Sequence, residues 1–173
     1  LMPCMEYKLA AVPGIEHGGA LRVKGPNVMK GYFLFDQPGV IQAPQSIGPG
    51  WYSAGDIVQR DDEGFIHIRG RLKRFAKIAG GMVSLEVIEK KATDAAPGFI
   101  HAASTRPDAA KGEALVLFTT DANLSRELLA TKARELGIPE LAVPRKILRV
   151  DALPLLGTGR TDYVTLKRMA ESA

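Results

Sequence analysis

Cysteine, histidine and aromatic side chains are scarce in this sequence of 173 residues. The single cysteine, Cys4, excludes an internal disulfide and fits a reducing compartment. The three histidines, His17, His67 and His101, are scattered, and no pair of them has the spacing of metal ligands. No Ser-His-Asp set is indicated either. The sequence therefore predicts no metal centre and no serine-hydrolase site.

Long apolar runs are also absent. No run reaches the roughly 18–20 residues that a helix needs to cross a bilayer, and no signal peptide is recognisable. Apolar residues make up 46% and charged residues 24% of the chain, which is the balance of a soluble globular protein. Because the chain begins with Leu1, inside a segment with a strand pattern, we expect a soluble piece of a longer protein.

Positive charge is in modest excess, with a net charge of +4. Its densest stretch is IRGRLKRFAKIAGG at 68–81, with the cations Arg69, Arg71, Lys73, Arg74 and Lys77. A solvated strand or loop face would explain these cations. A nucleic-acid interface needs aromatic stacking platforms, and only Phe75 is interleaved here. A third interpretation is a phosphate- or ribose-binding loop, because glycine lets the backbone approach an anion and arginine offers forked donors.

The first seventy residues have the pattern of a β structure. Short apolar segments are separated by turns rich in Gly, Pro and Asp, which predicts a small barrel or sandwich. The turn at 61–64 predicts a hairpin, and a loop is expected over 37–50. The predicted strands are 5–12, 20–24, 57–60 and 65–68.

Helices and strands alternate after about residue 73. Ser84 has the side chain of a helix N-cap, and Gly137 is placed as a C-terminal stop. The change of pattern predicts an α+β chain with a β-barrel-like subdomain at 1–72, then a hinge and a small α+β domain at 73–173. The predicted helices of the second domain are 85–92, 124–136 and 162–170, and its strands are 100–104, 114–120 and 146–150.

A candidate binding residue lies in the stretch GWYSAGD at 50–56, where Asp56 follows a glycine turn and precedes a predicted strand. A carboxylate in such a turn either satisfies nearby backbone N–H groups or accepts both hydroxyls of a ribose. Arg71 lies fifteen positions after Asp56, and the predicted hairpin between them would bring the two together. This pairing favours the ribose-binding interpretation.

The combination of motifs resembles the late motifs of the adenylate-forming superfamily, which includes acyl-CoA synthetases, luciferases and peptide-synthetase adenylation domains. The resemblance lies in GWYSAGD at 50–56, a strand–turn–strand, and GRLKRFAKIAGGMVSLEVIE at 70–89. Within the superfamily, essentially the whole chain is similar to the C-terminal portion of the bacterial bifunctional 2-acylglycerophosphoethanolamine acyltransferase/acyl-ACP synthetases (ACP, acyl carrier protein). The flanking stretches that carry this likeness are VKGPNVMKGY, KGEALVLFTTD, GIPELAVPR and LPLLGTGR.

By this resemblance, residues 1–72 are the last β-subdomain of the large AMP-binding domain, and 73–173 are the mobile C-terminal α+β domain. Asp56 would hold the ribose hydroxyls of ATP or of the acyl-adenylate, and Arg71 would bond the same ribose. Lys73 would be the hinge about which the C-terminal domain turns between two half-reactions.

The resemblance also assigns roles to the residues that follow the hinge. Gly80 and Gly81 would lie in the loop that admits the pantetheine thiol to the adenylate. Arg74 and Lys77 would either contact the pantetheine phosphate or acidic carrier-protein helices, or remain surface cations.

One position departs from the superfamily pattern. Members carry a lysine in a glycine-rich loop near the C-terminus, and PLLGTGRTDY at 154–163 places Arg160 there. Arginine keeps the charge but is planar and forked, so the exchange is not conservative where one point charge must meet two oxygens. Either Arg160 serves as the catalytic cation with weakened adenylation, or the register differs. Lys167, two helical turns further on, is expected to be an exposed helix residue.

The resemblance implies an acid–thiol ligase that uses ATP and Mg²⁺. In the full-length protein, a long-chain fatty acid would be adenylated and then transferred to the phosphopantetheine of acyl carrier protein. A lysophospholipid would be the second substrate, at the cytoplasmic face of the inner membrane. The His-x4-Asp motif of the acyltransferase is absent, as are the phosphate loop and acyl pocket of the synthetase, so we expect this piece alone to be inactive.

Three alternatives remain open from the residues. An acyl-CoA synthetase would share the same motifs and use free CoA as the acceptor. A non-catalytic binding module for an acidic protein partner would explain the departure at Arg160. A nucleic-acid module would bind with a steep salt dependence, and we expect only weak, non-specific attraction.

Overall fold

The computed structural model describes residues 3–44, 47–135, 137 and 139–173. The chain forms two compact units, Leu1–Lys73 and Arg74–Ala173. They divide one residue after the expected boundary, inside the short 3-10 helix Leu72–Arg74. The identification of these units with the two domains of an adenylate-forming enzyme remains a prediction.

The first unit is built on an antiparallel sheet in the order β1-β2-β5-β6. Among the described residues no pairing joins the outer strands β1 and β6, so the sheet is open. The predicted barrel-like subdomain is therefore not a closed barrel, since four strands are too few to close around a packed interior. The strands are β1 Glu6–Ala10, β2 Gly19–Lys24, β5 Trp51–Arg60 and β6 Ile66–Arg71.

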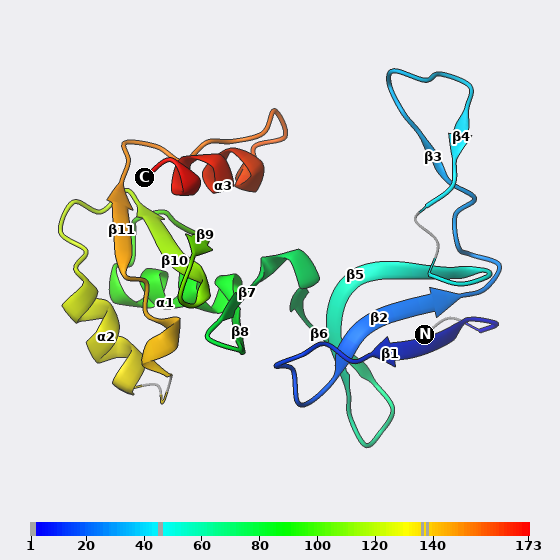
Figure 1. Ribbon diagram of the computed structural model, residues 1–173, viewed down its shortest axis with the longest axis horizontal. Helices are drawn as coiled ribbons and strands as arrows, with labels where there is room; N and C mark the ends of the chain where they lie inside the picture. Colours follow the sequence, from blue (N-terminus) through cyan, green and yellow to red (C-terminus); the bar gives the residue numbers. More distant parts are fainter. Residues whose placement is uncertain (1–2, 45–46, 136, 138) are drawn as a thin grey trace. The chain divides into compact units, whose positions relative to one another are not determined.

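A two-stranded hairpin, β3 Tyr32–Phe33 and β4 Ile41–Gln42, extends away from this sheet (Figure 1). The expected loop over 37–50 therefore contains a strand, and part of that loop, residues 45–46, lies outside the described residues. The Tyr32 and Tyr52 hydroxyl oxygens lie 3.1 Å apart and link the hairpin to β5. The apolar side chains that the hairpin and its flanks expose are Met29, Tyr32, Phe33, Leu34, Phe35, Val40 and Ile41.

The second unit is a five-stranded sheet in which β10 is central, pairing in parallel with β11 and antiparallel with β9 and β7. The three strands predicted here are found. The hairpin of β7 and β8 was not predicted, because four-residue segments next to a glycine pair resemble a loop in the sequence. The strands are β7 Phe75–Ile78, β8 Gly81–Ser84, β9 His101–Asp108, β10 Gly112–Thr119 and β11 Lys146–Arg149.

Three helices cover this sheet: α1 Leu85–Ala95, α2 Arg126–Glu135 and α3 Tyr163–Glu171. The Ser84 side chain accepts a hydrogen bond from the Val87 backbone N–H, which confirms it as the N-cap of α1. The predicted end of the second helix, Leu136, lies outside the described residues. None of the helices in the described part of the chain has the length and apolar character needed to span a membrane.

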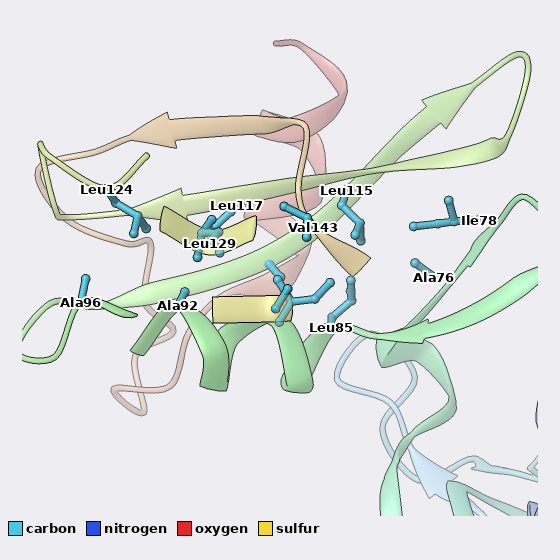
Figure 2. Close-up of a cluster of buried hydrophobic side chains, with 13 residues drawn as sticks. Ala76, Ile78, Leu85, Ala92, Ala96, Leu115, Leu117, Leu124, Leu129 and Val143 are labelled. Carbon is cyan, nitrogen blue, oxygen red and sulfur yellow. The ribbon is translucent and has the colours of Figure 1, made fainter. Parts of the chain in front are cut away.

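The alternation of side chains along β10 builds a core on each face of the second sheet. Leu115 and Leu117 point into a cluster with α1 and α2 (Figure 2), whereas Val116 and Phe118 point into a cluster with α3. Figure 1 shows the same layers, with α3 on the opposite face from α1 and α2. In the first unit the buried hydrophobic residues are few: Ala20, Ile57 and Val58.

Candidate functional site

Strands β5 and β6 place Asp56 directly opposite Arg71. The Arg71 Nε atom lies 3.1 Å from the Asp56 Oδ1 atom, and Arg71 Nη1 donates a hydrogen bond of 3.3 Å to the Ala54 carbonyl oxygen. The Asp56 side chain is 17% exposed, whereas the Arg71 side chain is 66% exposed. A sheltered carboxylate thus holds a guanidinium whose remaining donors face solvent.

The setting of Asp56 differs from the sequence prediction in one respect. The glycine turn ends at Gly50, and Asp56 lies inside the ten-residue strand β5 rather than before a strand. Two irregularities flank it: Gly55 has a φ of 75°, and the register with β6 shifts between Ile57 and Val58. A positive φ favours glycine at position 55, because a Cβ would strain the backbone there.

The basic stretch at 68–81 is not one continuous cationic surface. Arg69 donates two hydrogen bonds, of 3.1 Å and 2.7 Å, to the Gln59 side-chain oxygen. Arg71 is held by Asp56, and Arg74 is mostly buried in the second unit. Lys73 and Lys77 are exposed, and their expected roles, as the hinge and as a phosphate or carrier-protein contact, stay predictions. Arg69 and Arg74 have partners inside their own units, whereas Arg71 keeps donors that face solvent, so these cations do not act as one continuous surface.

Arg74 is engaged inside the protein rather than offered to a partner. Its guanidinium forms an ion pair of 2.5 Å with Glu89, donates a 3.0 Å hydrogen bond to the Ala103 carbonyl oxygen, and stacks 3.7 Å from the centre of the Tyr163 ring. The side chain is 13% exposed. The guanidinium thus has partners inside the second unit, and the expected contact with a pantetheine phosphate or a carrier protein stays a prediction for Arg74.

Gly80 lies in the tight turn between β7 and β8, and Gly81 follows it as the first residue of β8. Ile78 pairs with Gly81, and the two turn residues Ala79 and Gly80 have φ values of 48° and 84°. Positive φ at both central positions is the requirement of a type I′ hairpin turn. Gly80 therefore lies at an exposed hairpin tip, whereas Gly81 begins β8 rather than lying in a loop.

Arg160 lies at the end of an exposed loop between β11 and α3. The loop closes on itself, because the Leu156 N–H donates to the Arg160 carbonyl oxygen at 2.7 Å and Leu155 pairs with Thr161. Lys167 is not a free helix cation: its ammonium donates to Thr105 at 2.7 Å and lies 3.7 Å from carboxylates of Glu113 and Glu171. Arg160 thus lies on an exposed loop, whereas Lys167, with a side chain that is 40% exposed, has partners on neighbouring elements.

Lys91, in the middle of α1, is a buried cation that sequence analysis did not single out. The residue is 8% exposed, its Nζ atom has no hydrogen-bond partner among the described residues, and burial lowers its pKa. Next to the exposed Lys90 it has the sequence appearance of an ordinary helix lysine. Only the packing of α1 against α2 distinguishes the two.

The second unit also has a cavity of about 250 Å³ beside η2, Glu140–Ala142. Apolar residues including Leu115 and Leu141 form part of its wall, together with charged residues of both signs. None of the expected site residues is among those that line it in the described part of the chain. Within the same residues no group of three or more His, Cys, Asp or Glu side chains could hold a metal ion.

No protein-family model matches the chain. Curated relatives do: the chain is 30% identical over 161 residues to 2-hydroxy-7-methoxy-5-methyl-1-naphthoate–CoA ligase of Streptomyces carzinostaticus, covering 91% of this chain. It is 30% identical over 156 residues to enterobactin synthase component E of Escherichia coli (strain K12), covering 89% of this chain. The chain spans 28% of the length of each of these relatives.

The fold has close counterparts among solved structures. ATP-bound MatB from Rhodopseudomonas palustris aligns with 97% of this chain at a TM-score of 0.73 and 25% identity, over 34% of its own length. The chain thus has the C-terminal-like domain of the adenylate-forming, or acyl-CoA synthetase, superfamily, a small α+β domain with three helices. The two curated relatives are named as a CoA ligase and as a component of a synthase.

Proposed function

We propose that this chain is the C-terminal part of an ATP-dependent acid–thiol ligase. The observation that carries the proposal is the Asp56–Arg71 pair on neighbouring strands, with its sheltered carboxylate and exposed guanidinium. A carboxylate accepts hydrogen bonds from two adjacent hydroxyls, and a guanidinium donates to the same sugar or its phosphate. The pair therefore suits the ribose of ATP and of an acyl-adenylate.

The proposed reaction has two steps. First, a carboxylate oxygen of the acid attacks the α-phosphorus of ATP, and pyrophosphate leaves with the bonding electrons. Then a thiol loses its proton to solvent, its sulfur attacks the acyl carbon, and AMP leaves. Mg²⁺ would enter with the ATP phosphates, and the proposal assigns no residue of this chain to it. Catalysis of both steps consists mainly of positioning and charge stabilisation.

Arg160 is proposed as the cation of the first step. It would neutralise the charge that builds up at the α-phosphate, and rotation about Lys73 would then withdraw it and present the turn at Gly80 for the second step. The exposed loop supports this role, and the internal bonds of Lys167 argue against that lysine as a substitute.

The pair is tested in the full-length protein by ATP–pyrophosphate exchange. Asp56→Asn and Arg71→Met are each expected to lower kcat/KM for ATP by roughly 10- to 150-fold, the range for losing a hydrogen bond to a charged group. Arg69→Met is the matched control, because Arg69 lies two residues away on β6 and bonds only Gln59 among the partners described for it. Equal activity in all three variants would refute the assignment of the ribose site.

We further propose that the acid is a long-chain fatty acid and that the acceptor is the phosphopantetheine of acyl carrier protein. In this proposal the ligase supplies acyl groups for lysophospholipid reacylation at the cytoplasmic face of the inner membrane. Its support is the likeness of the flanking stretches at 23–32, 111–121, 137–145 and 153–160 to acyl-ACP synthetases.

A CoA ligase is the second candidate, because a relative that aligns with 91% of this chain is named as one. The two are separated by supplying the full-length protein with one fatty acid and either CoA or carrier protein. The acyl-ACP proposal expects a kcat/KM for carrier protein well above that for CoA. The opposite order would assign the chain to the CoA ligases.

A further alternative is a non-catalytic binding module. Pyrophosphate exchange by Arg160 variants separates this alternative from the ligase. If adenylation is the function, Arg160→Lys restores the point charge usual in the superfamily and is expected to raise the exchange rate, whereas Arg160→Ala abolishes it. If wild type and both variants show no exchange with any acid tried, while substitution of Lys77 weakens binding of an acidic partner, the module is favoured.

A further inference from the structure

Three contacts, an ion pair, a hydrogen bond and a stacking contact, meet at the first residue of the second unit, Arg74. Its guanidinium forms the ion pair with Glu89 of α1, donates to the Ala103 carbonyl oxygen of β9, and stacks on the Tyr163 ring of α3. The Arg74 and Glu89 side chains are 13% and 17% exposed, so solvent screens their attraction little. The Arg74 side chain, directly after the joint at residue 73, thus contacts three elements of the second unit, α1, β9 and α3.

Glu89 completes the cluster from the other side. One carboxylate oxygen accepts hydrogen bonds from Arg74 and from the Ala103 backbone N–H at 2.8 Å, and the other accepts from the Tyr163 hydroxyl at 3.3 Å. Burial raises the pKa of Tyr163, and the Glu89 carboxylate raises it further, so the hydroxyl stays a donor. Each member of the Arg74–Glu89–Tyr163 cluster therefore contacts both of the others.

Tyr163 also directly follows the loop that carries Arg160. It is the first residue of α3, whose N-cap Asp162 donates its backbone N–H to the Pro154 carbonyl oxygen at 2.8 Å. The loop is braced further by the Leu156–Arg160 and Gly159–Leu156 backbone hydrogen bonds, of 2.7 Å and 2.8 Å. Arg160 thus stands three residues from a ring that is clamped to Arg74.

We propose that Arg74, Glu89 and Tyr163 are positioning residues that couple the joint at residue 73 to the Arg160 loop. Because the cluster links residue 74 to the start of α3, a turn of the backbone at Lys73 carries the loop with it as part of one rigid body. The proposal rests on the proposed function, in which Arg160 must reach the α-phosphate in the first step and leave in the second. Arg74 then acts through Arg160 and does not itself touch substrate.

The kinetic test separates the two half-reactions in the full-length protein. Pyrophosphate exchange reports the first, and thioester formation from a chemically supplied acyl-adenylate reports the second. Glu89→Gln and Tyr163→Leu are expected to lower kcat of the first by about 10- to 100-fold, the scale of a small misplacement of a catalytic group. The KM for ATP and the rate of the second half-reaction are expected to change less than about 2-fold.

Tyr163→Phe is the conservative rescue, because it keeps the ring stacked on Arg74 and removes only the hydroxyl. It is expected to retain most of the activity that Tyr163→Leu loses. Arg126→Met is the matched control, since it removes an exposed ion pair with Glu140 in the same unit and should change neither half-reaction. Equal losses in both half-reactions, or no loss in either, would overturn the positioning role.

A second measurement does not depend on activity. Hydrogen exchange at the Leu156, Gly159 and Asp162 amides of the 173-residue chain is expected to speed up at least several-fold in Glu89→Gln and to stay unchanged in Arg126→Met. Unchanged exchange in Glu89→Gln overturns the coupling itself. If the wild-type protein shows no pyrophosphate exchange while amide exchange responds as expected, the coupling stands and the proposed function fails.

Discussion

Lys91 is a basic residue that is buried without a hydrogen-bond partner for its amine among the described residues. Lys91 lines a small cavity together with Leu129, Val143 and Pro144. Burying a charge without a partner costs free energy, which is why burial lowers the pKa of Lys91 below its ordinary value of 10.5. The folded state carries this cost whenever the amine is charged.

Lys91→Met is therefore expected to raise the free energy of unfolding at pH 7 by about 1–3 kcal/mol. The folded pKa is lowered, so the penalty is complete below that folded value. It fades as the pH rises from there towards 10.5, where the unfolded chain also loses its proton. Urea unfolding at pH 7 and near pH 10 should thus show the gain shrinking with pH.

The exposed neighbour gives the control for this prediction. Lys90→Met changes the same charge one residue away and should leave the free energy of unfolding within about 0.5 kcal/mol at both pH values. A loss of stability in Lys91→Met would show that the amine has a partner in the folded protein, and a gain that does not vary with pH would show that no penalty for burying the charge is relieved.

Residues with strong local signals were predicted well, and residues with distant partners were not. Fifteen positions and a turn signal were enough to expect that a hairpin would bring Asp56 and Arg71 together, and the register places them opposite each other. Arg74 looked like its neighbours in the basic stretch, because its partners Glu89 and Tyr163 lie 15 and roughly ninety positions away. No local pattern encodes such contacts.

Helix α3 depends on its first residues. The Asp162 carboxylate accepts hydrogen bonds from the Val164 and Thr165 backbone N–H groups, at 3.0 Å and 3.1 Å, and from the Thr165 hydroxyl at 2.7 Å. These hydrogen bonds lower the pKa of Asp162 below 3.8, and the bond from the Thr165 hydroxyl has the largest effect. A carboxylate at a helix N-terminus is also stabilised by the positive end of the helix dipole.

Asp162→Ala is expected to lower the stability of the chain at neutral pH. The folded pKa is depressed, so the contribution of Asp162 is complete above 3.8 and is lost as the pH falls through the folded value. Urea unfolding of the wild type and the variant should therefore converge in acid. Asp151→Ala is the control, because Asp151 is exposed and lies before the loop that precedes α3. It should show no such pH-dependent difference in stability.

Elements with a long periodic pattern were easier to predict than short ones. The helix after Ser84 and the eight-residue strands β9 and β10 combine a clear apolar pattern with caps or turns. The four-residue strands β7 and β8 have no such length, and their pairing follows from the turn at Ala79 and Gly80. The hairpin β3–β4 was missed for the same reason.

The two units differ in how much core they contain. Both apolar clusters of the described residues draw only on positions 76–170, around the fully buried strand residues Leu117 and Phe118. The first unit buries few large side chains by itself. Stability from burial is therefore concentrated in the second unit.

Residues 74–173 alone are expected to fold and to unfold in one cooperative transition, because their clusters need no residue from the first unit. Phe118→Ala in this piece should lower the free energy of unfolding by about 3–5 kcal/mol, the usual cost of removing a buried phenylalanine. Circular dichroism during urea unfolding measures both. A piece without a cooperative transition would mean that the first unit supplies part of the core.

The order of residues along the chain was sufficient for the motifs, for most periodic elements and for the change near residue 73 from β to α+β structure, because each depends on neighbours within one or two turns. The open edge of the first sheet, the internal bonds of Arg74 and Lys167, and the burial of Lys91 came only from packing. In each of these cases the free energy depends on groups that are remote in the chain and adjacent in space.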